Sequence, residues 1–167
     1  LQSSDAILRL FLFWGIFIPW GKRFSIDGLA TAEKKHIVYS PGIAALFLQI
    51  FFIYFFAGLA KVYIGSDWMR GTAVYYALNI DQFATPLAVF MRNYFVFTEF
   101  LSYLVIALEI CASCALLSSS ANGKIRMGAV AALMLMHVGF RLFLNLAHFT
   151  WIGMISVLPF LPSHFWG

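Results

Sequence analysis

The feature that most constrains this chain is a run of uncharged, mostly apolar residues from 41 to 60. A helix needs about 20 apolar residues to cross the hydrocarbon core of a bilayer, and this run has that length. Pro41 suits the first turn of a helix, where a missing N–H is harmless, and Lys61 ends the run. The segment is therefore predicted to be a transmembrane helix.

The composition extends this prediction to the whole chain. Hydrophobic residues make up 62% of the sequence and charged residues only 11%, whereas a soluble domain usually carries about 25% charged residues. The net charge of +4 is modest, and no basic run interleaved with polar residues indicates a nucleic-acid partner. We therefore expect the protein to lie in membrane lipid and to have no nucleic-acid partner.

Four further apolar runs complete the predicted fold. Only helices and closed barrels cross lipid, and these runs are continuous rather than alternating, which favours helices. The sequence predicts an all-α, polytopic transmembrane bundle of about five spans in a single domain over residues 1–167, with the first and last spans short. The additional runs are residues 6–20, 94–117, 126–147 and 149–161.

The polar connections predict smaller elements and an orientation. Residues 63–92 are expected to form one or two short interfacial helices, residues 21–40 a loop with a short surface helix, and residues 118–124 a turn. Lysine and arginine concentrate in residues 21–40 and around residues 118–124. The positive-inside rule therefore places both of these segments in the cytoplasm. Lys61 and Asp67 then lie on the non-cytoplasmic side.

Ionisable groups inside a span are functional candidates by default. On one helix, the side chains of His137, Arg141, Asn145 and His148 would fall at about 0°, 40°, 80° and 20° and share one face. This polar stripe predicts either a binding site for a polar headgroup or substrate, or hydrogen bonds between helices. In the second case Arg141 would pair with Glu99 or Glu109.

Lys61 is the second candidate, followed closely by Asp67 and Trp68. A lysine in an apolar pocket can act as a base, whereas a lysine at a helix C-terminus often extends to the headgroups. The carboxylates of Glu99 and Glu109 are expected to form structural ion pairs, the first with Arg92.

The remaining motifs predict no metal site. Cys111 and Cys114 have C-x-x-C spacing, but no other cysteine could complete a zinc site, so small-residue helix packing is expected there. No glycine-rich phosphate loop, G-x-S-x-G or H-E-x-x-H motif is present.

Three stretches together resemble the vitamin K-dependent gamma-carboxylases and their bacterial relatives, the HTTM (horizontally transferred transmembrane) domain proteins. The most specific is QIFFIYFFAGLAKVYIGSDW at residues 49–68, followed by Gly71 and Tyr75. The others are FSIDGL at residues 24–29, and the segment from His137 through FTW at 149–151 to LPSHFW at 161–166. They occur in the family's order over most of the chain.

The resemblance implies a lipid quinone or quinol as cofactor and Lys61 at the position of the lysine that deprotonates the quinol. It also implies a bacterial inner membrane and agrees with a non-cytoplasmic Lys61. Two departures argue against peptide carboxylation: the position matching a family histidine is near Ser4, and the chain stops at Gly167, where the carboxylases continue into a soluble domain. We expect the chain to be the later part of a longer membrane domain.

Two functional hypotheses follow. The favoured one is a non-catalytic accessory or scaffolding subunit that packs with other membrane subunits, because the first and last spans look incomplete alone. The alternative is a lipid-quinol-dependent carboxylase- or epoxidase-like enzyme with Lys61 as base. A transporter has less support, because the sequence shows no internal repeat.

Overall fold

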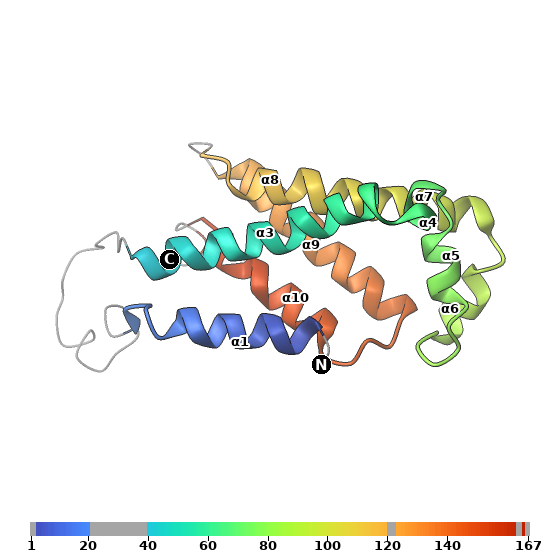
Figure 1. The fold of residues 1–167 in the computed structure, drawn as a ribbon, viewed down its shortest axis with the longest axis horizontal. Helices are drawn as coiled ribbons and strands as arrows, with labels where there is room; N and C mark the ends of the chain where they lie inside the picture. Colours follow the sequence, from blue (N-terminus) through green and yellow to red (C-terminus); the bar gives the residue numbers. More distant parts are fainter. Residues whose placement is uncertain (1–2, 21–39, 120–122, 163–164, 166–167) are drawn as a thin grey trace. The chain divides into compact units, whose positions relative to one another are not determined.

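A computed structural model describes residues 3–20, 40–119, 123–162 and 165 (Figure 1). In these residues the regular elements are helices, and the only β-type pairing is an isolated bridge between Ala84 and Leu144. The predicted all-α fold is therefore confirmed. The chain forms two compact units, Leu1–Gln49 and Ile50–Gly167.

The first unit contains α1 (Ser3–Gly15) and the start of α3 (Pro41–Tyr63). Ser40 Oγ donates a hydrogen bond of 3.1 Å to Phe17 O just before α3 begins. A Cβ placed on Gly42 would lie 2.7 Å from the Cβ of Phe17, so a glycine is needed for this contact. The surface helix predicted within residues 21–40 falls almost wholly outside the described residues.

Among the residues that the structure describes, three helices are long and apolar enough to cross a membrane. They are α3, the continuous segment Phe95–Leu116, and α9 (Lys124–Phe143), with 23, 22 and 20 residues. The predicted runs at 41–60, 94–117 and 126–147 correspond to these helices.

The predicted count of about five spans is not confirmed. The first run forms only the 13 residues of α1, and the last forms α10 (Phe149–Val157, 9 residues) followed by a 3-10 turn at Leu158–Phe160. At about 1.5 Å per residue, each is too short to cross the hydrocarbon core alone. In the second unit α10 packs against α9 (Figure 1).

Three short helices, rather than one or two, connect α3 to Phe95–Leu116. They are α4 (Ser66–Met69), α5 (Ala73–Leu78) and α6 (Pro86–Met91). Gly71 turns the chain between α4 and α5 with a φ of 73°, a conformation that favours glycine. The buried Ser102 Oγ accepts a 3.1 Å hydrogen bond from Val74 N, which fixes the start of α5.

The C-terminal end of α9 is fixed by the loop that precedes α6. Phe143 O accepts a hydrogen bond of 3.0 Å from Thr85 N, and Asn145 N donates one of 2.7 Å to Phe83 O. Leu144 is consequently extended, with φ −131° and ψ 133°. The predicted helix over residues 126–147 is therefore wrong in its last turn.

The span Phe95–Leu116 is not a uniform α-helix. It consists of α7 (Phe95–Ala107), a π-helical segment η2 (Leu108–Ala112) and α8 (Ser113–Leu116). The π-helical turn buries Ala112 while Cys111 and Cys114 remain free and exposed. The two cysteines therefore do not pack between helices as expected, whereas Ala112 and Ser113 between them are buried.

Candidate functional site

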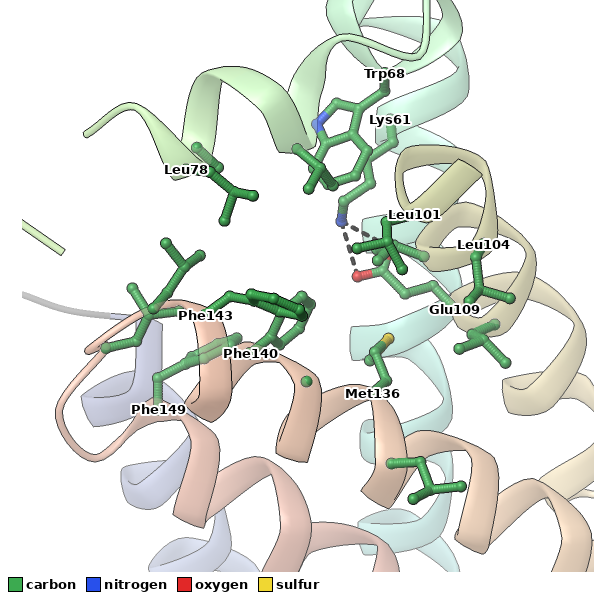
Figure 2. Close-up of a pocket in the computed structure, with 18 of the residues that line it drawn as sticks. Lys61, Trp68, Leu78, Leu101, Leu104, Glu109, Met136, Phe140, Phe143 and Phe149 are labelled. Atoms are coloured by element: carbon green, nitrogen blue, oxygen red, sulfur yellow. Dashed lines mark hydrogen bonds and ion pairs between the residues drawn. The ribbon is translucent and has the colours of Figure 1, made fainter. Parts of the chain in front are cut away.

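An ion pair between the partly buried Lys61 and the buried Glu109 is the central feature of the second unit (Figure 2). Lys61 Nζ lies 2.8 Å from Oε1 and 2.6 Å from Oε2 of Glu109. The side chains are only 19% and 8% exposed. The ammonium group also lies 4.9 Å from the centre of the Trp68 ring, within the range of a cation–π interaction.

Gly58 lets the two helices that carry this pair approach each other. A Cβ on Gly58 would lie 2.6 Å from Ile110 Cγ1 and 3.1 Å from Glu109 Cβ. Lys61 follows Gly58 by one helical turn on α3, while Glu109 belongs to the π-helical segment. π-helical turns occur frequently at functional sites, and this one directs a carboxylate toward Lys61.

The position of the Lys61 amine differs from that of a lysine that extends to the headgroups. Its Nζ turns toward Glu109 and the cavity (Figure 2) rather than extending away as an unpaired headgroup lysine. Each charge compensates the desolvation of the other, since removing one partner of a buried pair strands a charge at a cost of about 3–5 kcal/mol.

The ion pair borders a cavity of about 540 Å³ (Figure 2). Lys61 and Glu109 are the charged residues of its wall, and most of the remainder is aliphatic or aromatic. Its mouth and walls come from α3, α4, α5, Phe95–Leu116, α9, α10 and the loop between the last two. Wall residues include Trp68, Leu78, Leu101, Leu104, Leu108, Met136, Gly139, Phe140, Phe143 and Phe149.

A second buried polar cluster lies behind the aromatic wall of the cavity. Tyr54 OH lies 3.3 Å from His137 Nε2 and from Ser156 Oγ, and it donates to Gly153 O at 3.2 Å. The His137 ring stacks on Phe149, with ring centres 5.7 Å apart. A Cβ on Gly153 would overlap the His137 ring, so the histidine needs a glycine opposite it.

The predicted polar stripe does not form one helical face. His137 is buried within α9, but the helix ends at Phe143, before two of the four residues. Arg141, Asn145 and His148 are exposed and lie outside the cavity wall. Arg141 Nη1 contacts Asn145 Oδ1 at 3.4 Å. The stripe prediction is wrong because the loop around Thr85 ends the helix early.

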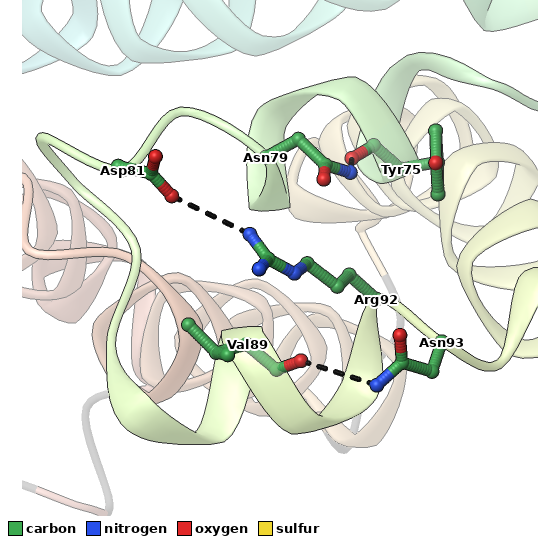
Figure 3. A network of polar contacts seen from close by, with 6 residues as sticks. All are labelled: Tyr75, Asn79, Asp81, Val89, Arg92 and Asn93. Carbon is green, nitrogen blue, oxygen red and sulfur yellow. Dashed lines mark hydrogen bonds and ion pairs between the residues drawn. The ribbon is translucent and has the colours of Figure 1, made fainter.

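The other predicted residues divide between the cavity and the surface. Trp68 lines the cavity beside Lys61, whereas Asp67 is exposed and outside it. Arg92 contacts Asp81 at 3.4 Å rather than the expected Glu99 (Figure 3). The Asp81 side chain is 89% exposed, and such surface pairs contribute little to stability.

Sequence reasoning expected Glu109 to form an ion pair, and offered Arg141 as a partner of Glu99 or Glu109 only in the alternative reading of the polar stripe. The structure does form an ion pair at Glu109, but with Lys61. The available signal was that each is a charge in a long apolar helix, and such charges pair with one another. Spacing within one helix could not show which charge on another helix would face it.

Comparison with known families supports the membrane assignment. The model of the HTTM domain matches residues 6–166, which is nearly the whole chain. The protein belongs to the HTTM family. No curated protein and no solved structure gives a significant match to the HTTM protein. Its family and its apolar helices together make it a membrane protein.

The HTTM match spans both compact units and includes the cavity residues. Among its described residues, no three His, Cys, Asp or Glu side chains are grouped so that they could hold a metal ion. The cavity wall itself offers an amine, a carboxylate and aromatic rings.

Proposed function

We propose that this HTTM protein binds a lipid-soluble quinol in the cavity, with Lys61 as the candidate base. The observation that carries the proposal is one partly buried ion pair, Lys61–Glu109, at the edge of an otherwise apolar cavity. Such a cavity suits a molecule with an apolar body and one polar edge. The resemblance of residues 49–68 to the gamma-carboxylases supports a quinol as that molecule.

The size and walls of the cavity agree with a ring compound. Small-molecule sites usually have volumes of about 300–1,000 Å³ and apolar walls with few polar groups. The cavity has about 540 Å³, and Trp68, Phe140, Phe143 and Phe149 offer aromatic surfaces to a ring. A quinol ring between them would bring a hydroxyl group toward Lys61.

Lys61 can accept a proton only as the free amine. The 2.6 Å contact with Glu109 gives the ammonium proton a direct path to the carboxylate, which yields a neutral amine beside a neutral acid. The amine then takes the quinol hydroxyl proton: the O–H bond breaks, an N–H bond forms, and a quinolate remains beside the ammonium group.

Quinol-dependent oxygen uptake tests the catalytic part of the proposal. We expect the double variant Lys61→Met with Glu109→Gln to lose this uptake by about 100-fold or more, because the base is absent. The double change avoids a stranded buried charge and so preserves the fold. Lys124→Met, at the exposed start of α9, is the matched control and should keep full uptake. Unchanged uptake in the double variant contradicts the assignment of Lys61.

Quinol binding tests the cavity independently of catalysis. Gly139 lines the cavity and has open space at its Cβ position, so Gly139→Phe should fill the cavity and abolish binding. Gly128, on the same helix and also with open space, lies outside the cavity wall, so Gly128→Phe should bind like the parent protein. Equal quinol binding by both variants places the ligand elsewhere and overturns the proposal.

A non-catalytic accessory role in a larger membrane complex is the second candidate. It is favoured by the apolar helix Phe149–Phe160, which is too short to span a membrane alone and suits packing against a neighbouring subunit. Purification in mild detergent from its native membrane, for which we propose the bacterial inner membrane, separates the candidates. A stable monomer without partners that consumes oxygen with quinol contradicts the accessory role.

A further inference from the structure

The charged edge of the cavity carries no net charge when Lys61 and Glu109 are paired. Their contacts of 2.8 and 2.6 Å direct the ammonium group toward both carboxylate oxygens. The other residues of the cavity wall are uncharged. A molecule entering this cavity therefore meets an electrically balanced pair rather than a positive site.

The pair offers a ligand both a donor and an acceptor. An ammonium group has three N–H donors, and two directed at Glu109 leave one for a ligand oxygen. The Glu109 oxygens retain lone pairs that can accept a hydrogen bond. A hydroxyl group can accept from Lys61 and donate to Glu109 at once, whereas a sulfonate or carboxylate head can only accept.

An anionic head faces a further cost. It must lose its hydration in a cavity with apolar walls, and the repulsion from Glu109 offsets the attraction to Lys61. Like charges brought together in a binding site disfavour binding.

We propose that Glu109 is a specificity-determining residue that admits uncharged hydroxyl compounds to the cavity and excludes anionic amphiphiles of the same shape. This inference rests on the proposed function, because it assumes that the cavity binds a ligand. It adds a role for Glu109 that is separate from proton transfer and that binding alone can measure.

The test compares two bicyclic probes, 2-naphthol and 2-naphthalenesulfonate, by equilibrium binding to the purified protein in uncharged detergent. The sulfonate keeps its negative charge throughout. We expect the protein to prefer 2-naphthol by at least about tenfold. Glu109→Gln should reverse the preference, because it leaves the Lys61 ammonium without its counter-charge. Lys61 is partly exposed, at 19%, so its charge retains some access to solvent in that variant.

Glu99→Gln is the matched control, since it makes the same substitution on the same span outside the cavity wall. It should leave the ratio of the two affinities unchanged. The double variant Lys61→Met with Glu109→Gln should bind 2-naphthol but lose the sulfonate binding gained by Glu109→Gln. If Glu109→Gln does not fold, the parent protein alone still tests the inference. Equal affinities of the parent protein for 2-naphthalenesulfonate and 2-naphthol overturn it.

The outcomes separate the two proposals. Binding of 2-naphthol that Gly139→Phe abolishes, with no change of preference in Glu109→Gln, contradicts the role of Glu109 but leaves the proposed ligand cavity standing. Absence of binding by either probe, or binding that Gly139→Phe does not alter, overturns both proposals.

Discussion

At the scale of single residues, Lys61 and Glu109 depend on each other. Glu109 is 6% exposed as a residue, so its carboxylate relies on Lys61 in place of water for compensation of its charge. The same contact that fits a chemical site is therefore also a stability requirement. Activity loss in a single Lys61 variant could thus come from misfolding rather than from the missing amine.

We predict that Lys61→Met lowers the free energy of unfolding by about 3–5 kcal/mol, because it leaves the buried Glu109 carboxylate unpaired. Adding Glu109→Gln should restore most of this loss. Thermal unfolding in detergent of the parent, both single variants and the double variant measures the coupling. Additive losses in the double variant would show that the pair does not form.

Gly153 gives a second prediction at this scale. Gly153→Ala places a methyl group where the His137 ring lies, so the histidine must move and its contact with Tyr54 weakens. We expect a loss of about 1–3 kcal/mol, the usual effect of overpacking. Gly128→Ala is the control. A Cβ at Gly128 meets open space, so this substitution should not lower the free energy of unfolding. A Gly153→Ala variant as stable as this control contradicts the packing around His137.

At the scale of elements, the π-helical segment and the loop before α6 position the site. The segment Leu108–Ala112 turns Glu109 toward Lys61, and Gly58 permits the close approach of α3. The loop holds the end of α9, from which Phe140 and Phe143 enter the cavity wall. The π-helical segment contributes the Glu109 carboxylate to the cavity wall, and the loop before α6 contributes no charge but fixes the position of the aromatic wall.

Within this loop, we expect substitution of Thr85 to lower the free energy of unfolding most. Its Oγ1 donates 2.7 Å to Leu142 O and accepts 3.3 Å from Ala88 N as the N-cap of α6. We predict that Thr85→Val costs about 1–2 kcal/mol and increases amide hydrogen exchange near Phe143. Thr72→Val, which loses only one exposed bond of 3.2 Å to Asp67 O, should cost less. Equal effects of the two substitutions would contradict the role of Thr85 as a clamp.

At the scale of the whole molecule, the HTTM protein is a membrane protein, and the described part of its chain contains three helices long enough to cross a bilayer. Successive spans alternate in direction, so we propose that the Lys61 end of α3 and the start of α9 at Lys124 lie on opposite sides of the membrane. The charge bias of residues 21–40, which precede α3, favours the side opposite Lys61 as cytoplasmic. The Lys61 end is then proposed to be non-cytoplasmic.

Cysteine labelling in intact cells tests this orientation. In a background with Cys111 and Cys114 replaced by alanine, we expect Asp67→Cys to react with a membrane-impermeant maleimide and Lys124→Cys to react only after the membrane is permeabilised. Both positions are exposed. The reverse labelling pattern would invert the proposed topology, and labelling of both in intact cells would contradict the predicted sidedness.

The sequence alone was sufficient for the membrane class, the helical fold, the family and the main helices. Long uncharged runs have one stable solution in lipid, since each backbone polar group must be paired within the segment. Residues 41–60 therefore predicted α3 to within three residues of its observed end, Tyr63. Lys61 was also identified as a candidate because it ends the uncharged run, and Trp68 because it follows Lys61 closely.

Only the tertiary structure decided which charges meet and where the helices end. Glu109 faces Lys61 rather than Arg141, and α9 stops at Phe143 because hydrogen bonds from the distant loop around Thr85 end it. Helical periodicity describes one segment at a time, whereas a cavity or an ion pair between segments depends on their rotation and on close contacts such as those at Gly58 and Gly153. The hydrophobicity of a segment follows from its own residues. The partners of the few polar side chains in the spans are determined only when the helices pack.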